Sequence, residues 1–266
     1  MIPLGQLVGA GRSGDVYTFG AGKVIKLFHP HRDADHVHRE FSHARAVSER
    51  GLPAPAVYEE INYDGRRGIV FEHAVGVQME KAMMRHPLLI PCMAKRLARL
   101  HLALHRCKVP TLPWQIERYG EKIRASTQMP FALQRTVLDL LYRLPLGDAV
   151  CHGDLTPQNV VVTDSGEKVV DWLNATQGNP MACVAETSVS LLRRRPGLSL
   201  FFMGGAWLFR RLYLAEYFRE SGPAQEQLAH WEVVVSAAML QTADYPPERH
   251  RLRKRMQSLL ETGSGR

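Results

Sequence analysis

Apolar residues in the first 75 positions occur in short runs separated by glycine and other turn-forming residues, the pattern of an antiparallel meander. The last two runs flank the pair Asp64-Gly65, which favours a tight hairpin turn. This part of the chain is therefore predicted to form a sheet of about five strands. The runs are residues 4–8, 15–19, 23–28, 57–61 and 67–71.

A single helical pattern interrupts these runs between residues 33 and 50. Its apolar residues recur three or four positions apart, so they share one face of a helix. Gly51 follows as a signal that ends the helix. We therefore predict one helix inserted into the sheet. Its apolar positions are Val37, Phe41, Ala44 and Val47.

The pattern becomes mainly helical after Gly76, with apolar residues again at helical spacing. We therefore predict an α+β fold class, with a small antiparallel-sheet N-lobe at residues 1–75 and a larger helical C-lobe at residues 76–266. The predicted helices cover residues 91–107, 115–126, 131–143 and most of the chain after Met181. A short strand at residues 150–152 and a hairpin of residues 159–163 and 168–171 are predicted between them.

The composition is that of a globular protein, with 45% hydrophobic and 23% charged residues in a chain of 266. The longest apolar run, residues 198–209, is too short to span a bilayer, so no membrane insertion is expected. The N-terminus lacks the charged and apolar regions of a signal peptide. The four cysteines form no CxxC pair and are interpreted as reduced thiols of a cytoplasmic protein.

The net charge of +8 is unevenly distributed, because residues 1–75 hold nine basic and nine acidic residues. Two basic clusters stand out, at residues 193–195 and 249–255. One hypothesis is a patch for phosphate or nucleic acid, and the other is solvated helix ends. The clusters lack interleaved aromatic residues, which favours solvated helix ends, and we expect no nucleic-acid partner.

A glycine-rich motif lies between the first two predicted strands, in the sequence GAGRSGDV. A dinucleotide-binding fold would need a helix to begin at the third glycine, but a strand is predicted there. A glycine loop between two strands is typical of the loop that covers the phosphates of ATP in kinases, and a plain glycine hairpin is the alternative. The candidate cofactor-binding residues in this loop are Gly9, Gly11, Ser13 and Gly14.

The next predicted strand contains the sequence Val24-Ile25-Lys26, and its lysine can contact phosphate oxygens. Such a lysine needs an acidic partner, and Glu40 in the predicted helix is the candidate. The alternative is an exposed strand lysine and a surface glutamate.

The strongest signal is the sequence HGDLTPQN at residues 152–159, followed by Asp171 twelve positions after Asn159. Phosphoryl transfer needs a carboxylate that orients or accepts the proton of the attacking hydroxyl, and oxygen ligands for Mg²⁺. Asp154 suits the first role. Asn159 and Asp171 flank the predicted hairpin and suit the second. These residue types also favour turns, but their order and spacing fit phosphoryl transfer better.

The motifs CHGDLTPQNVVV and VVDWLNATQGNP resemble the aminoglycoside phosphotransferase and choline kinase family, which has a two-lobed protein-kinase-like fold. The resemblance extends from the glycine loop to about residue 192 and implies ATP and Mg²⁺ as cofactors. It also implies that Glu72 and Ala74 bind adenine through backbone groups, that Asp154 is the catalytic base, and that Asn159 and Asp171 hold Mg²⁺. The chain departs from the family at Cys183, where the family usually has Asp.

Two features argue against a protein kinase. Gly153 occupies the position where regulated protein kinases have Arg, and only eight residues separate Asp171 from Pro180. We therefore predict a phosphotransferase that moves the γ-phosphate of ATP to a hydroxyl of a small-molecule substrate. Two alternatives are a kinase-fold nucleotide-binding regulatory protein without transfer activity, and a basic-patch nucleic-acid-associated protein. Nothing in the pattern indicates an oligomeric state.

Two weaker patterns occur in the helical region. His101 and His105 are spaced as metal ligands can be, but no third ligand is visible nearby, so we interpret them as core histidines. A later aromatic stripe is predicted to be core and not a cage for a quaternary ammonium. The stripe consists of Trp207, Phe209, Tyr213 and Tyr217.

Overall fold

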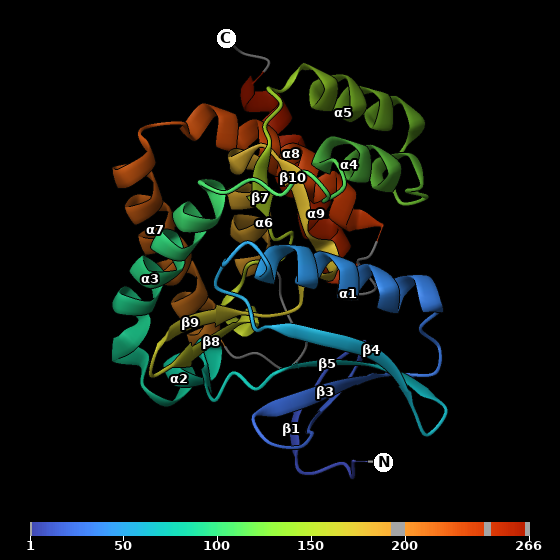
Figure 1. The fold of residues 1–266 in the computed structure, drawn as a ribbon. Helices are drawn as coiled ribbons and strands as arrows, with labels where there is room; N and C mark the ends of the chain where they lie inside the picture. Colours follow the sequence, from blue (N-terminus) through green and yellow to red (C-terminus); the bar gives the residue numbers. More distant parts are fainter. Residues whose placement is uncertain (1, 193–199, 242–245, 264–266) are drawn as a thin grey trace. The chain divides into compact units, whose positions relative to one another are not determined.

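The computed structural model describes residues 2–192, 200–241 and 246–263. The chain divides into two compact units (Figure 1). The N-terminal unit consists of Met1–Ala82 and Pro157–Ala175, and the helical unit consists of Met83–Thr156 and Thr176–Arg266. These units differ from the predicted lobes, residues 1–75 and 76–266, because the later segment Pro157–Ala175 belongs to the N-terminal unit.

The N-terminal unit contains a five-stranded antiparallel sheet with the order β1-β2-β3-β5-β4. It confirms the predicted sheet, although the first strand begins at Leu7 instead of Leu4. The α+β class is also confirmed, with an antiparallel sheet in the N-terminal part and helices in the C-terminal part. The strands are β1 (Leu7–Ala10), β2 (Gly14–Thr18), β3 (Lys23–Phe28), β4 (Val57–Tyr63) and β5 (Arg66–Glu72).

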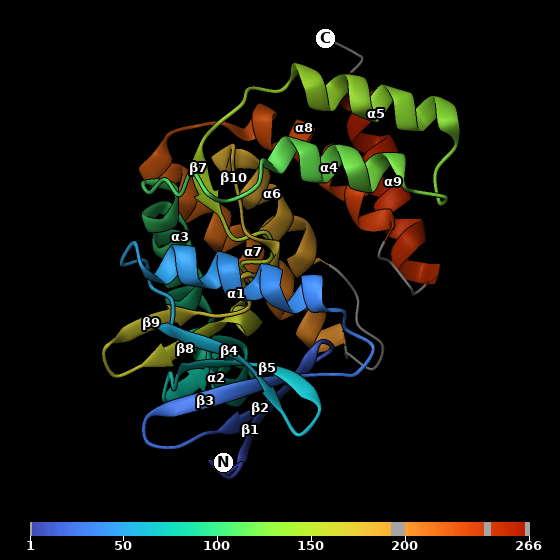
Figure 2. The same ribbon diagram turned by 45° about the vertical axis from the view of Figure 1, so that its right-hand side comes forward.

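Helix α1 (Ala34–Ser48) runs along one face of this sheet in both views (Figures 1 and 2). Asp33 caps its N-terminus, because its side chain accepts a hydrogen bond of 2.7 Å from the His36 N–H. Val37 of α1 packs with Phe28 and Ile69 of the sheet in one buried cluster. The helix is therefore fixed to the sheet by its apolar face.

Strand β3 divides its side chains between the two faces of the sheet. Ile25 and Leu27 belong to a cluster with Phe19 and Val70, whereas Phe28 belongs to the cluster that contains α1. Because side chains alternate along a strand, Lys26 points to the same face as Phe28. The alternation places the lysine on the side of α1.

A second, three-stranded antiparallel sheet of the N-terminal unit has the order β6-β8-β9. Its hairpin of β8 (Val160–Thr163) and β9 (Gly166–Val169) confirms the predicted hairpin. Strand β6 (Gly76–Gln78), which precedes α2 (Met79–Arg85), was not predicted.

The helical unit is built around α6 (Pro180–Leu191), whose residues from Met181 to Val189 are all buried. α8 packs along α6 and α9, and α3 packs along α7. Figure 2 shows α4 and α5 side by side. The other helices are α3 (Ile90–His105), α4 (Gln115–Arg124), α5 (Phe131–Arg143), α7 (Leu200–Ser221), α8 (Gln225–Leu240) and α9 (Pro246–Gly263).

The helical unit also contains a two-stranded sheet, which packs against α3, α4 and α6. Strand β7 (Ala149–Cys151) pairs antiparallel with β10 (Thr176–Gly178). The first of these strands begins one residue before its predicted position, and the second was not predicted. Among the described residues, no helix combines the length and the apolar character needed to cross a bilayer.

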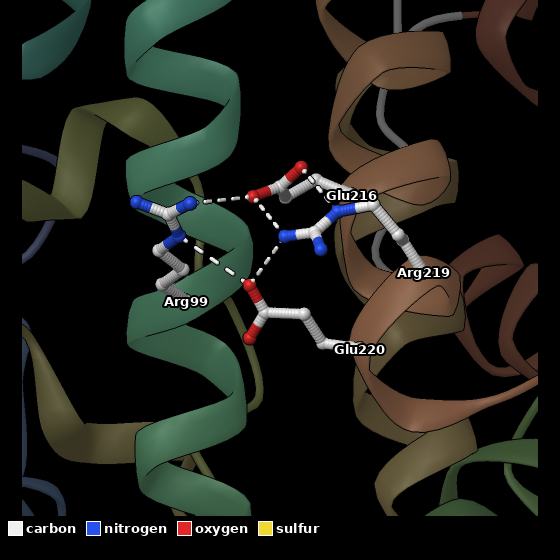
Figure 3. Close-up of polar contacts among 4 residues, drawn as sticks. All are labelled: Arg99, Glu216, Arg219 and Glu220. Carbon is white, nitrogen blue, oxygen red and sulfur yellow. Dashed lines mark hydrogen bonds and ion pairs between the residues drawn. The ribbon is translucent and has the colours of Figure 1, made fainter.

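The contact between α3 and α7 has a charged edge (Figure 3). Arg99 of α3 donates to Glu216 Oε1 at 3.0 Å and to Glu220 Oε1 at 3.4 Å. Arg219 donates to Glu216 at 3.0 Å and to Glu220 at 2.8 Å, so two arginines share two glutamates. The hydrogen bond from Arg219 lowers the pKa of Glu216, which keeps the carboxylate charged.

Candidate active site

Lys26 and Glu40 form a buried ion pair in the N-terminal unit. The Lys26 Nζ lies 2.6 Å from Glu40 Oε1, and the side chains are 11% and 2% exposed. Lys26 comes from β3 and Glu40 from the sheet-facing side of α1, so the sheet's alternation and the helix's period bring them together. The partnership expected from the sequence is therefore present in the structure.

A second carboxylate reaches the same lysine. Asp171 Oδ1 lies 3.6 Å from Lys26 Nζ. Burial by itself lowers the pKa of Lys26, but the charges of Glu40 and Asp171 outweigh it and raise the pKa above its usual value. Lys26 is therefore a protonated, positively charged group at neutral pH.

Asp171 is held at the end of the β8–β9 hairpin by contacts on both sides. The indole N–H of Trp172 donates to the Val169 carbonyl at 2.8 Å. His43 of α1 donates through Nδ1 to the Leu173 carbonyl at 3.1 Å, within the short 3-10 helix Trp172–Asn174. These contacts fix the hairpin end to α1 and so place Asp171 beside Lys26.

The backbone of Asp171 adopts a left-handed conformation, with φ 66° and ψ 62°. Only two non-glycine residues in the described part of the chain have positive φ, and the other is Asp64 in a turn. Asp and Asn tolerate this region better than other residues with a Cβ. The side chain of Asp171 is 44% exposed, which leaves it open to a ligand.

Asn159 lies at the same end of this hairpin, directly before the first residue of β8. The N–H of Val170, the residue before Asp171, donates to the Asn159 carbonyl at 2.9 Å. The hairpin therefore brings an amide and a carboxylate from residues twelve positions apart to one end of a sheet. Oxygen atoms of this kind fit the ligand preference of Mg²⁺.

The glycine loop connects β1 and β2 and is fixed by backbone contacts. The Gly11 N–H donates to the Gly14 carbonyl at 3.0 Å, and the His29 N–H donates to the Ser13 carbonyl at 2.9 Å. A Cβ at Gly14 would lie 2.3 Å from the Leu27 carbonyl oxygen of the neighbouring strand, so only glycine fits there. A Cβ at Gly9 would make only ordinary contacts, 3.7 Å or more, so sheet packing does not require that glycine.

Glu72, expected to contact adenine through its backbone, lies at the end of β5, and Ala74 lies just beyond it. The Glu72 N–H donates to the Ala56 carbonyl at 2.8 Å, and the Glu72 carboxylate accepts a hydrogen bond of 3.0 Å from the Ala56 N–H. Lys168 pairs with the same carboxylate at 3.2 Å. The Ala56 hydrogen bond and then Lys168 hold the pKa of Glu72 below its usual value, so this side chain is engaged in the fold.

Asp154 belongs to the helical unit, in the loop that follows β7. The Asp154 N–H donates to His152 Nδ1 at 3.2 Å, and Gly153 between them has a φ of 77°. The Leu155 carbonyl accepts a hydrogen bond of 2.9 Å from Thr187 of α6. The loop is therefore anchored to the central helix of its own unit.

Glu186, a buried carboxylate on α6, was not among the predicted site residues. Arg118 of α4 donates to Glu186 Oε1 at 3.2 Å, while Oε2 makes no hydrogen bond among the described residues. Burial raises the pKa of Glu186 to about 7, Arg118 opposes the shift, and the charge of Asp154 adds to it. A lone acid within the apolar stretch MACVAETSVSLL was the available signal.

Cys183, where the family usually has Asp, is buried on α6 beside His101 of α3. Its Sγ lies 2.9 Å from His101 Nε2. Burial raises the pKa of the Cys183 thiol, but the hydrogen bond from Cys151 and the charge of His101 outweigh it, and the pKa lies below its usual range.

Three residues of the basic cluster of α9 contact other parts of the helical unit. Arg249 donates to the Gln128 side chain and Arg253 to the Gln128 carbonyl. Arg255 pairs with Glu232 of α8, which is buried. Three of the five basic residues are therefore used in internal contacts. The other basic cluster, residues 193–195, lies outside the described residues.

Solved structures with a similar fold include two proteins named as kinases and a complex with ATP and streptomycin. A choline/ethanolamine kinase family protein from Mesorhizobium loti matches with a TM-score of 0.65 and 16% identity, over 97% of this chain and 88% of that one. Amicoumacin kinase hAmiN, solved with AMP-PNP, Ca²⁺ and Ami, matches with a TM-score of 0.61 and 14% identity, over 97% and 88%. A ternary complex of APH(2")-IIa with streptomycin and ATP matches with a TM-score of 0.57 and 16% identity, over 97% and 91%.

These neighbours show that the chain has a kinase-like fold. A model of the APH phosphotransferase enzyme family matches residues 5–231, and the chain belongs to this family. The family resemblance expected from the two motifs is thereby confirmed. No curated protein matches the sequence.

Proposed function

We propose that this protein transfers the γ-phosphate of ATP, in the presence of Mg²⁺, to a hydroxyl group of a small molecule. The observation that supports it best is the lysine held between two carboxylates, with Lys26 Nζ 2.6 Å from Glu40 and 3.6 Å from Asp171. A buried lysine with a fixed charge can bind phosphate oxygens without reorganising its surroundings. The use of ATP as the phosphate donor also fits a cytoplasmic protein.

The residues of the N-terminal unit would bind the nucleotide. Backbone N–H groups of the loop formed by Gly9, Gly11, Ser13 and Gly14 would cover the phosphates. Backbone groups of Glu72 and Ala74 would bind adenine. Asn159 and Asp171 would hold Mg²⁺, which when bound neutralises the negative charge of the phosphates. The amide and carboxylate oxygens at one hairpin end fit this ion.

Asp154 would act on the acceptor. Its carboxylate would orient the acceptor hydroxyl and take its proton as the new oxygen–phosphorus bond forms. The bond between the γ-phosphorus and the bridging oxygen breaks, and ADP leaves with that oxygen. The short segment between Asp171 and Pro180 leaves little chain for a peptide platform, which favours a small-molecule acceptor.

The experiment is transfer of labelled γ-phosphate from ATP to pooled aminoglycosides, amino alcohols, sugars and nucleosides. We expect label in one pool with the wild type and a loss of about 10²–10⁴-fold with Asp154→Asn. Asp139→Asn, an exposed aspartate of α5, is the matched control and should keep full activity.

Two outcomes would contradict the proposal. Absence of Mg-ATP binding by the folded wild type would remove its basis. Binding of Mg-ATP without transfer to any pool, and without ATP hydrolysis, would favour a nucleotide-binding regulatory protein.

A further inference from the structure

Two histidines of α3 face two tyrosines of α7 in a repeated arrangement. His101 Nδ1 lies 2.6 Å from the Tyr213 hydroxyl, and His105 Nδ1 lies 2.9 Å from the Tyr217 hydroxyl. The two histidines are four residues apart, and so are the two tyrosines. Four residues are about one helical turn, so the second contact repeats the first. Each tyrosine engages the Nδ1 atom of its histidine. This arrangement fixes both rings and leaves both Nε2 atoms for another partner.

Cys183 of α6 lies beside both histidines. Cys183 Sγ lies 2.9 Å from His101 Nε2. His105 Nε2 is buried and forms no hydrogen bond among the described residues. One ligand atom from each of the three residues can be chosen so that all lie within 4.8 Å of one another. Cys183 therefore interacts with both histidines, but its 2.9 Å hydrogen bond is to His101, and His105 Nε2 has no such close contact in the described part of the chain.

We propose that His101, His105 and Cys183 bind a divalent transition-metal ion, with zinc as the best match. One sulfur and two imidazole nitrogens form a ligand set that zinc takes in proteins. The tyrosine hydroxyls would accept hydrogen bonds from the Nδ1–H groups, which selects the tautomer with a free Nε2 on each ring. On binding, the Cys183 thiol releases its proton to solvent and both imidazoles stay neutral.

The ligands are unsuited to the magnesium ion of the proposed phosphotransfer reaction. Mg²⁺ prefers oxygen ligands, whereas this cluster offers sulfur and nitrogen. All three residues lie in the helical unit, and they join α3 to α6, with α7 attached through the tyrosines. The ion would therefore act as a structural link within that unit. The third ligand is 82 positions from His101 in the chain, so the sequence spacing of the two histidines gives no sign of it.

The first test is metal binding by the untagged wild-type chain. Elemental analysis after zinc loading and gel filtration should find one zinc ion per chain. Cobalt substitution should give the absorption bands of a tetrahedral site with a thiolate-to-cobalt charge-transfer band. Zinc should also raise the midpoint of thermal unfolding, and a chelator should reverse the rise. Failure to retain zinc, or a cobalt spectrum without the thiolate band, would overturn the proposal.

Variants separate this cluster from other thiols. Cys183→Ser should abolish the thiolate band, whereas Cys107→Ser, just beyond the end of α3, should keep it. Tyr217→Phe leaves all three ligands in place and should weaken zinc binding by about 10–100-fold, as loss of a partner of a ligating histidine does. A thiolate band that survives in folded Cys183→Ser, or zinc affinity unchanged in Tyr217→Phe, would contradict the assignment. None of these readouts depends on phosphotransfer.

Discussion

The Nζ atom of Lys26 lies 2.6 Å from the Oε1 atom of Glu40, and both side chains are almost entirely removed from solvent. Burying two charges is costly unless they pair with good geometry. The fold supplies that geometry by placing Lys26 on the α1 side of the sheet and Glu40 on the sheet side of α1. One contact therefore links the packing of α1 to the lysine proposed to bind phosphates.

The first prediction concerns stability. Lys26→Met should lower the free energy of unfolding by about 3–5 kcal/mol, because it leaves the Glu40 carboxylate buried without a partner. Glu40→Gln should cost less, because Asp171 still pairs with Lys26. The double variant Lys26→Met/Glu40→Gln should lose less than the sum of the single variants. Urea unfolding measures these values. Lys23→Met on the same strand is the control, expected within about 0.5 kcal/mol of the wild type. Additive losses in the double variant would show that the pair is not coupled.

The second prediction uses the left-handed backbone of Asp171. Asn tolerates this conformation, so Asp171→Asn should fold with nearly unchanged stability while its Mg²⁺ requirement rises strongly. Asp171→Ala should show the same defect and an added loss of about 1–2 kcal/mol in unfolding free energy from backbone strain. Magnesium titration of ATP turnover and urea unfolding separate the two effects. A Mg²⁺ dependence unchanged in Asp171→Asn would remove Asp171 from the metal site.

Much of the fold and part of the site follow from local patterns. The five strands and the hairpin are visible because short apolar runs are separated by glycine and other turn-forming residues. The pairing of Lys26 with Glu40 follows from the same logic, since strand alternation and helical period each fix the direction of one side chain. Strands β6 and β10 were missed, because a strand of three residues is too short for a periodic signal.

Contacts between distant segments explain what the sequence could not show. The partner of His101 is Cys183, and Glu186 meets Arg118, 68 positions away. No local periodicity encodes such pairs, because they depend on how helices pack. Gly14 shows a different limit, since its lack of a Cβ is required by Leu27 on the next strand, whatever its role toward a ligand.

The third prediction concerns stability in acid. The pKa of Glu72 in the folded chain lies below its ordinary value of 4.5, so its contribution to stability is fully present above pH 4.5 and is lost as pH falls through the folded pKa. Glu72→Gln should therefore reduce stability at neutral pH and flatten the decline below pH 4.5. Unfolding midpoints measured across the acid range test this, with Glu59→Gln on β4 as an exposed control. An acid decline equally steep in Glu72→Gln would contradict the assignment.

The last prediction concerns Glu186, for which the sign is opposite. Its folded pKa of about 7 lies above the ordinary value of 4.5, so between these values the folded chain holds a proton that the unfolded chain has lost. The contribution of Glu186 to stability must therefore fall as pH rises from about 4.5 to about 7, by a total on the order of 1–3 kcal/mol. Glu186→Gln keeps the shape and an oxygen for Arg118 but cannot titrate, so it should gain stability relative to the wild type as pH rises through this window. Glu117→Gln, an exposed residue of α4, should follow the wild type at every pH. A constant difference between Glu186→Gln and the wild type across the window would mean that Glu186 is ionised throughout, and the burial argument for its raised pKa would fail.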